Sequence, residues 1–210
     1  MMHAKVIEVS IVMSDNINRQ AEATIPTKWG EFSMIAYESG MAEYTPDLAL
    51  VHPDMDVRKT VDVRIHSECF TGDLFHSQRC DCGDQLDAAM KHVEKSKGVV
   101  IYLRQEGRGI GIVNKLKAYN KQDEGMDTIE ANIALGLEID YRHYRNAIAI
   151  LEELEITQIN LLTNNPEKIE AFDNSSITII DRIPLDIKSN FHNHSYLKTK
   201  RDSLGHILDL

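Results

Sequence analysis

The three cysteines of the chain, Cys69, Cys80 and Cys82, lie within fourteen consecutive residues. Thiolates bind Zn²⁺ at about 2.3 Å, and three protein ligands plus one water form the arrangement of a catalytic zinc site. Such an open coordination position lowers the pKa of the bound water to about 7 and makes it a nucleophile at neutral pH. The cluster therefore predicts a metal centre that carries out hydrolytic chemistry.

Two other interpretations of the cysteine cluster stay open on the residues alone. A structural zinc site needs four ligands, and His66 or His76 would have to supply the fourth, because the spacing matches no common zinc finger. The other alternative is three buried free thiols that pack as small apolar side chains. An odd number of cysteines argues against a disulfide framework, and the polar neighbours Gln78, Arg79 and Asp81 favour the metal.

Two further segments favour an anionic ligand. The first is Arg104-Gln105-Glu106-Gly107-Arg108-Gly109-Ile110-Gly111, where glycines let the backbone approach a ligand and a following helix offers free N–H groups to an anion. It matches neither a Walker A loop nor a Rossmann fingerprint, so a plain strand-to-helix turn explains it equally well. The second is Thr163-Asn164-Asn165-Pro166-Glu167-Lys168, in which Thr163 and Lys168 are candidates to hold phosphate oxygens. A capped helix start with a solvated lysine is the alternative there.

Hydrophobic periodicity predicts the elements that position these segments. In the first third, β-favouring residues predict strands around residues 6–13, 31–37, 48–52 and 61–66. After residue 83, apolar spacing and capping residues predict helices around 86–93, 110–122, 144–154 and 195–207, and helices that start near Asp127 and Pro166. Buried strands are predicted at 99–103, 159–162 and 177–180. The fold class is therefore α/β: a single mixed domain with a strand-rich N-terminal third, then alternating strands and helices.

Composition sets the broad class of protein. A chain of 210 residues with 42% apolar and 27% charged residues is typical of a soluble globular domain. No apolar run approaches the ~18 residues of a membrane span, and no signal peptide is recognisable, so we expect a cytoplasmic protein without a membrane partner. The net charge of −10 argues against a nucleic-acid partner. Residues 64–117 nevertheless hold nine Lys/Arg against seven Asp/Glu, which suits a small anionic ligand.

Five motifs, in order, closely resemble the signature of the GTP cyclohydrolase II family. They are Arg64-Ile65-His66-Ser67-Glu68-Cys69-Phe70-Thr71-Gly72-Asp73, Arg79-Cys80-Asp81-Cys82-Gly83-Asp84-Gln85-Leu86, the glycine-rich segment that begins at Arg104, Asp127-Thr128-Ile129-Glu130-Ala131-Asn132, and Leu161-Leu162-Thr163-Asn164-Asn165-Pro166. The match extends from about residue 25 to the tail that ends in Gly205-His206. Residues 25–210 are accordingly expected to form the catalytic domain, and residues 1–24 an N-terminal extension without an assigned role.

The resemblance implies a reaction and its cofactors. The imidazole ring of GTP would be opened, the carbon between its two nitrogens would leave as formate, and pyrophosphate would be released. The product would be a diamino-pyrimidinone ribosyl phosphate, the first committed intermediate of riboflavin synthesis. The resemblance also implies one zinc ion per chain, a Mg²⁺ ion with the GTP phosphates, and a homodimer.

The resemblance further implies a role for individual residues. Cys69, Cys80 and Cys82 correspond to the zinc ligands, and Tyr119 to a tyrosine near the reacting ring. Asp140 corresponds to a proton acceptor and Arg142 to a nucleophile. The positions that correspond to GTP contacts are Arg64, Ile65, His66, Ser67, Glu68, Gln85, Glu106, Gly107, Arg108, Thr128, Thr163 and Lys168.

The implied arginine nucleophile conflicts with the chemistry of its side chain. A guanidinium is effectively always protonated, so attack on the α-phosphate would require a strong local base. Asp140 and Arg142 could instead orient and stabilise the phosphate while water attacks directly, and a carboxylate two residues from an arginine is usually an ordinary loop ion pair. Both roles stay open on the sequence.

Two alternatives to the full ring-opening reaction of GTP stay open on the sequence. One is a related enzyme that stops at the formamide or releases only pyrophosphate, and Tyr119 argues against early release by resemblance. The other is a zinc-knuckle module that binds RNA or a protein, and the acidic balance and the missing fourth cysteine argue against it.

Overall fold

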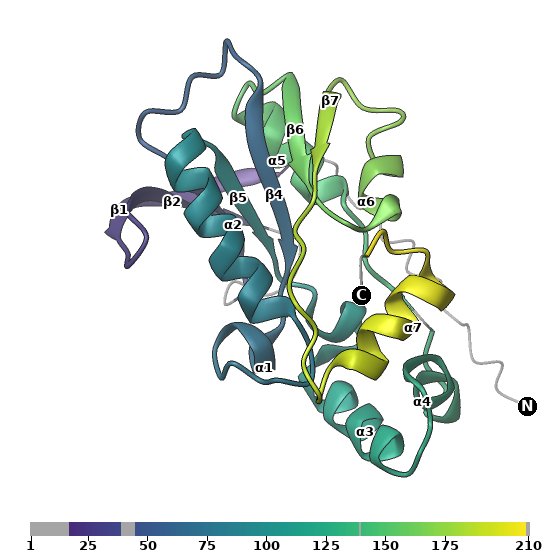
Figure 1. Ribbon diagram of the computed structural model, residues 1–210. Helices are drawn as coiled ribbons and strands as arrows, with labels where there is room; N and C mark the ends of the chain where they lie inside the picture. Colours follow the sequence, from purple (N-terminus) through teal and green to yellow (C-terminus); the bar gives the residue numbers. More distant parts are fainter. Residues whose placement is uncertain (1–16, 39–44, 139, 209–210) are drawn as a thin grey trace, which may run out of the picture.

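Seven strands join into one mixed sheet in this computed structural model, which describes residues 17–38, 45–138 and 140–208 (Figure 1). The strand order across the sheet is β1-β2-β3-β5-β4-β6-β7. The strands are β1 (Asn18–Pro26), β2 (Glu31–Glu38), β3 (Asp47–Val51), β4 (Val61–Ser67), β5 (Val99–Leu103), β6 (Gln158–Leu162) and β7 (Thr178–Ile183).

The sheet changes from antiparallel to parallel pairing at β5. Strands β1, β2, β3 and β5 pair antiparallel, whereas β5, β4, β6 and β7 pair parallel. The carboxyl ends of parallel strands meet at one edge of a sheet, where open α/β sheets place their ligands. The cysteine segment follows β4, the glycine-rich turn follows β5, and Thr163 follows β6. The topology therefore brings three separate sequence motifs to one edge.

The side chains of β5 alternate between the two faces of the sheet and pack against a different helix on each face. Val100 packs with Met90 and Val93 of α2 (Cys82–Ser96) on one face. Its neighbours Val99 and Ile101 belong to the larger cluster that includes α5 (Arg145–Glu153). Burying one large apolar side chain contributes about 1.5–3 kcal/mol. This two-sided core fixes the strand ends from which the candidate site is built.

The remaining helices follow strand ends or connect them, and α1, α3, α4 and α7 gather beyond one end of the sheet (Figure 1). They are α1 (Phe70–Asp73), the 3₁₀ turn η1 (Glu106–Gly109), α3 (Gly111–Asp123), α4 (Thr128–Ala134), α6 (Pro166–Glu170) and α7 (His194–Leu204). A capping box starts α4 as the sequence predicts, because the Asp127 carboxylate accepts from the Glu130 N–H and the Glu130 side chain accepts from the Asp127 N–H. Pro166 is the first residue of α6, also as predicted.

The predicted α/β class is confirmed, and one strand of the sheet was not predicted. Sequence patterns miss β1, because this edge strand is exposed along almost its whole length and has no apolar alternation. β1 also crosses the boundary at residue 25, so the division into an extension and a catalytic domain stays a prediction. Three α-helices, α3, α4 and α5, separate β5 from β6, as the sequence predicts. The strand predicted around residues 6–13 lies outside the described residues, and no described helix is long and apolar enough to cross a membrane.

Candidate metal centre and substrate pocket

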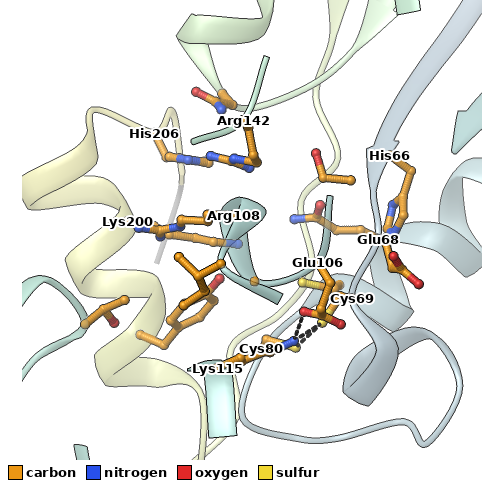
Figure 2. A pocket seen from close by; sticks show the side chains of 18 of the residues that line it. His66, Glu68, Cys69, Cys80, Glu106, Arg108, Lys115, Arg142, Lys200 and His206 are labelled. Atoms are coloured by element: carbon orange, nitrogen blue, oxygen red, sulfur yellow. Dashed lines mark hydrogen bonds and ion pairs between the residues drawn. The ribbon is translucent and has the colours of Figure 1, made fainter. Parts of the chain in front are cut away.

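One cavity at the carboxyl edge of the parallel strands collects residues from all the motifs singled out in the sequence (Figure 2). Its walls come from the ends of β4, β5 and β6 and from α2, α3, α4 and α7. The predicted site residues that line it are Arg64, His66, Ser67, Glu68, Cys69, Cys80, Cys82, Gln85, Glu106, Gly107, Arg108, Tyr119, Thr128, Arg142, Thr163 and Lys168.

The three cysteine sulfurs converge at one end of this cavity. The sulfurs of Cys69 and Cys80 lie 3.6 Å apart, and all three ligand atoms lie within 4.8 Å of one another. Two ligands of a tetrahedral ion at bond lengths of about 2.3 Å would be about 3.8 Å apart. The described residues therefore contain a group of three thiols that can hold one metal ion.

Neither histidine considered as a fourth ligand belongs to this group. His66 Nε2 lies 3.1 Å from a carboxylate oxygen of Asp73 instead, and burial lowers the pKa of His66. His76 joins the sulfurs in none of the metal-ligand groups found among the described residues. The observed donor set is three cysteines with no fourth protein ligand in the described part of the chain, which fits the open site rather than the structural one.

Lys115 of α3 supplies positive charge beside the thiols. Its ammonium donates to the Cys69 sulfur at 3.1 Å and to Glu106 Oε1 at 2.8 Å (Figure 2). Hydrogen bonds from the neighbouring thiols Cys80 and Cys82, together with Lys115, lower the pKa of Cys69. This positive charge favours the thiolate form of Cys69, which is the form that binds a metal ion. Lys115 could not be singled out from the sequence, because a lysine in an amphipathic helix carries no local signal of its own.

Gly72 leaves the space that the sulfurs occupy. A Cβ atom at this position would lie 3.1 Å from the sulfurs of Cys69 and of Cys80, and 3.2 Å from Cys82 Cβ. Contacts this short would force the side chains of the metal group apart.

We therefore expect Gly72→Ala to lower the metal content of purified protein by at least about tenfold after dialysis against a weak chelator, measured by elemental analysis. Misplaced ligands lose affinity on this scale. Gly30→Ala, whose new Cβ would meet the flexible side chain of Glu94, is the control and should keep its metal. Full metal content in Gly72→Ala would contradict the close approach described here.

Cationic side chains line the same cavity. Arg64, Arg108 and Lys168 all line it, and none of them forms an ion pair with a carboxylate within the described ranges. Burial, together with the charges of Arg64, Arg142 and Lys200, lowers the pKa of Lys168 far below its ordinary value. Burial lowers the pKa of Arg64 to about 10. Accumulating cations at a buried position is costly unless an anion balances them.

The turn after β5 directs Arg108 into the cavity. Gly107 and Arg108 both have φ near +60°, in the left-handed region, where an arginine is strained. One guanidinium nitrogen of Arg108, Nη1, is buried without a hydrogen-bond partner in the described structure. Buried donors are nearly always paired in proteins. An unpaired one beside a cavity, held by strained backbone, points to a ligand acceptor.

Asp140 and Arg142 form a close ion pair at the edge of the cavity. Arg142 donates from Nε at 2.9 Å and from Nη2 at 2.6 Å to the two carboxylate oxygens of Asp140. Burial opposes the charge on Arg142. The hydrogen bonds to Asp140 and the electrostatic influence of Tyr144 nevertheless leave the pKa of Arg142 above its ordinary value. Asp140 does not line the main cavity; it lines an adjoining pocket together with Arg142, Glu167 and His206.

Ile65 is the other predicted site residue that the main cavity does not include. Its side chain is 0% exposed and belongs to the sheet core. Its carbonyl oxygen accepts the hydrogen bond of the Lys168 ammonium at 2.8 Å. Ile65 therefore positions Lys168 through its backbone, and its side chain offers no surface to a ligand.

Residues near the C-terminus complete the wall, and the motif analysis assigned them no role. Tyr196 and Lys200 of α7 and His206 beyond it all line the cavity. Lys200 donates to Asp81 at 2.8 Å, and Asp81 lies between two cysteines of the metal group. This long-range pair ties α7 to the cysteine segment. The resemblance to the family extends into this tail, but no local sequence pattern indicates that the tail folds back across the edge of the sheet.

Comparisons with known proteins agree with this arrangement. The family model described as GTP cyclohydrolase II matches residues 18–184. A GTP cyclohydrolase-2 from Neisseria meningitidis is 50% identical over 198 residues, which cover 93% of this chain and 99% of the relative. The riboflavin biosynthesis protein RibBA of Chlorobium phaeovibrioides is 47% identical over 91% of this chain and 47% of its own length.

A solved structure, a two-domain 3,4-dihydroxy-2-butanone 4-phosphate synthase from A. baumannii, aligns with a TM-score of 0.43 and 18% identity over 81% of this chain and 41% of that one. The assignment does not depend on it, because the family model spans most of the sheet and the Neisseria relative matches almost end to end. The chain belongs to the GTP cyclohydrolase II family.

Proposed function

We propose that this protein is a zinc-dependent GTP cyclohydrolase II. It opens the imidazole ring of GTP, releases formate and pyrophosphate, and gives the diamino-pyrimidinone ribosyl phosphate that begins riboflavin synthesis. The observation that carries the proposal is a single cavity lined both by three converging thiols and by Arg64, Arg108 and Lys168, which form no ion pair among the described residues. A purine nucleotide would bind with its base near the thiols and its phosphates near the cationic side chains.

Zinc is the metal that best suits the thiol group. Three sulfurs at this spacing fit tetrahedral coordination, and soft thiolate ligands select zinc over hard cations such as Mg²⁺. Gly72 approaches two of the sulfurs so closely that a larger residue at this position would contact them. When bound, zinc supplies Lewis-acid activation of water toward the electron-poor carbon of the imidazole ring.

The residues around the zinc position order the thiols and the base end of the pocket. Glu106 holds the Lys115 ammonium against Cys69, and a second Glu106 oxygen accepts from the Phe70 N–H. Tyr119 lines the cavity beside this group, and burial raises its pKa to about 12, so its hydroxyl stays protonated and can donate to the ring or to the departing formyl group. Its place near the reacting ring supports full release of formate.

The cationic end binds the triphosphate. Arg64, Arg108 and Lys168 supply charge-assisted donors, which are about twice as strong as neutral hydrogen bonds. Thr163 lies beside them at the end of β6. A Mg²⁺ ion would bridge the phosphate oxygens and needs few protein ligands, so we propose that it arrives with GTP. The enzyme acts in the cytoplasm, where GTP is available.

The geometry favours an electrostatic role for Arg142. Both Asp140 oxygens already accept hydrogen bonds from this guanidinium, and its pKa is raised. A nucleophilic guanidine would have to lose the charge that this pair stabilises. We propose that Arg142 holds the α-phosphate while water attacks.

On this account Arg142→Lys lowers the rate of pyrophosphate release by about ten- to a hundredfold but does not abolish it. Lysine keeps the charge and loses the two-point geometry. Single-turnover assays of pyrophosphate measure this, with the exposed Arg145→Lys as the matched control. Complete loss of release in Arg142→Lys, together with a covalent nucleotide adduct on Arg142 of the wild type, would support the nucleophile instead.

A homodimer is the proposed assembly. Exposed apolar side chains lie on two neighbouring helical segments: Phe70, Leu74 and Phe75 at α1, and Val113 and Leu116 on α3. The contact between Lys115 and Cys69 brings α3 beside this segment. Exposed apolar patches of this kind mark protein interfaces, and sedimentation equilibrium should give twice the chain mass.

Product identification tests the proposed function. Purified protein with GTP, Zn²⁺ and Mg²⁺ should release formate and pyrophosphate in equal amounts, and the pyrimidine product should lack the formyl group. A product that keeps one CO unit would indicate an enzyme that stops at the formamide. Properly metallated protein that releases no formate would refute the proposal.

A further inference from the structure

The tail that follows β7 returns across the carboxyl edge of the sheet and closes one side of the cavity. Helix α7 lies at the same end of the sheet as α3 and α4 (Figure 1), and residues of all three helices line the cavity. It contributes Tyr196 and Lys200 to the wall, and the chain then places His206 in the same wall. The three residues come from a segment that is remote in sequence from the motifs of β4, β5 and β6.

Backbone interactions on both sides fix the position of His206. Helix α7 ends at Gly205, which adopts φ +66° in the left-handed region, a conformation that glycine reaches without strain. The His206 N–H then donates to the Lys200 carbonyl at 3.0 Å, and the next N–H, of Ile207, donates to the Asn164 carbonyl at 2.9 Å. The histidine is therefore held between the end of α7 and the loop after β6.

The imidazole of His206 faces the cationic end of the cavity. His206 and Arg142 line the adjoining pocket together, and His206 also lines the main cavity with Arg108, Lys168 and Lys200 (Figure 2). No hydrogen bond to its ring nitrogens is recorded among the described residues. Burial and the charges of Lys200, Arg142, Arg108 and Lys168 lower the pKa of His206 to about 3.

Among the described residues, no carboxylate forms an ion pair with His206. Glu138, Asp140 and Glu167 line the adjoining pocket, but both oxygens of Asp140 bind Arg142, and Glu167 lies 3.8 Å from the same guanidinium. The neutral imidazole of His206 therefore has an N–H without a partner in the described part of the chain and is surrounded by cationic side chains. A bound anion would satisfy both, because its charge balances the cations and its oxygens accept the N–H.

We propose that His206 is a phosphate-binding residue: its imidazole donates a hydrogen bond to the polyphosphate of the substrate, and the tail from α7 onward completes the phosphate end of the site. The inference rests on the proposed function in one respect, that the natural ligand is a nucleoside triphosphate. Lys200 acts beside it as a positioning residue, because its ammonium is bound to Asp81.

Inorganic tripolyphosphate is the probe, because it carries the phosphate chain without the base. In calorimetric titrations of zinc-loaded protein, His206→Ala should bind tripolyphosphate about ten- to a hundredfold more weakly than wild type, the loss expected for a hydrogen bond to a charged group. His206→Gln keeps an N–H donor and should recover part of the affinity. His192→Ala removes an exposed histidine of the same tail and should bind as wild type.

A measurement on the unaltered protein guards against variants that fold poorly. Diethyl pyrocarbonate modifies neutral imidazoles, and mass spectrometry locates the products. Tripolyphosphate should protect His206 and leave the labelling of His192 unchanged. Wild-type affinity in His206→Ala, an equal loss in His206→Ala and His206→Gln, or no protection of His206 would each overturn the inference.

The two proposals fail in different ways. Wild-type protein that binds tripolyphosphate through His206 but releases no formate from GTP would refute the proposed function alone. Formate release by the wild type, with the same KM for GTP in His206→Ala, would refute the phosphate contact alone.

Discussion

Cys80→Ser is expected to remove the metal and to lower formate release by at least about a thousandfold. Cys80 is one of the three proposed metal ligands among the described residues, and its sulfur lies 3.6 Å from that of Cys69. Serine is nearly the same size, so the fold and the cationic end should persist. A hydroxyl is not ionised near neutral pH and is a poor zinc ligand, so the remaining two thiolates would hold the ion weakly.

The measurement combines elemental analysis with a formate assay and a titration with tripolyphosphate. Zinc content should fall from about one per chain to near zero, while the affinity for tripolyphosphate should change by less than about threefold. Ser77→Ala, in the same loop but outside the sulfur group, is the control. Retained zinc and retained formate release in Cys80→Ser would show that Cys80 is no ligand.

Lys168→Met is expected to have the second largest effect, on substrate affinity. Lys168 is 5% exposed, and its one recorded hydrogen bond in the described structure goes to the Ile65 carbonyl. Removing one partner of a desolvated charge pair costs about 2–5 kcal/mol, so the KM for GTP should rise between about thirtyfold and several thousandfold. Methionine has similar length and no charge, so the steric change is small.

The same substitution should not weaken the ligand-free fold. Burial and neighbouring cations lower the pKa of Lys168, so the folded state disfavours its charge. Unfolded chains bind that proton more readily, which means that Lys168 costs stability below its unfolded-state pKa and that the cost shrinks as pH rises toward that value. Thermal unfolding at neutral pH should therefore give Lys168→Met a midpoint at or above that of the wild type.

A lower midpoint together with an unchanged KM would contradict this account, because Lys168 would then serve the fold rather than the ligand. Lys188→Met, an exposed lysine of the tail, controls for the general effect of removing a positive charge. It should change neither KM nor the unfolding midpoint measurably.

Much of the sheet can be predicted from local pattern, because its central strands are buried on both faces. Val99–Leu103 forms β5 as expected, and the Asp127–Glu130 pair starts α4 as expected. Strand β1 cannot be found this way. It is stabilised by hydrogen bonds to β2 at an exposed edge, and edge pairing leaves no periodic signal in one strand.

The residues of the candidate site likewise divide into those with a local sequence signal and those without one. The thiols and the loop residues after β4, β5 and β6 could be singled out because they form short motifs next to predicted strands. Lys115, Lys200 and His206 could not, because each reaches the cavity through tertiary contacts: the hydrogen bond of Lys115 to Cys69, the pair of Lys200 with Asp81, and the turn at Gly205. The side chain of Ile65 points into the core although the residue lies within a motif, and its role at the site stays a prediction.

We propose that one cavity joins a tris-thiolate metal site to a polyphosphate site for ring opening of GTP. The most direct measurement is elemental analysis of the purified protein combined with identification of its products from GTP. We expect about one zinc per chain and equal yields of formate and pyrophosphate, with both products lost on chelation of the zinc. Formate release by metal-free protein, or fully zinc-loaded protein that leaves the imidazole ring of GTP intact, would contradict it.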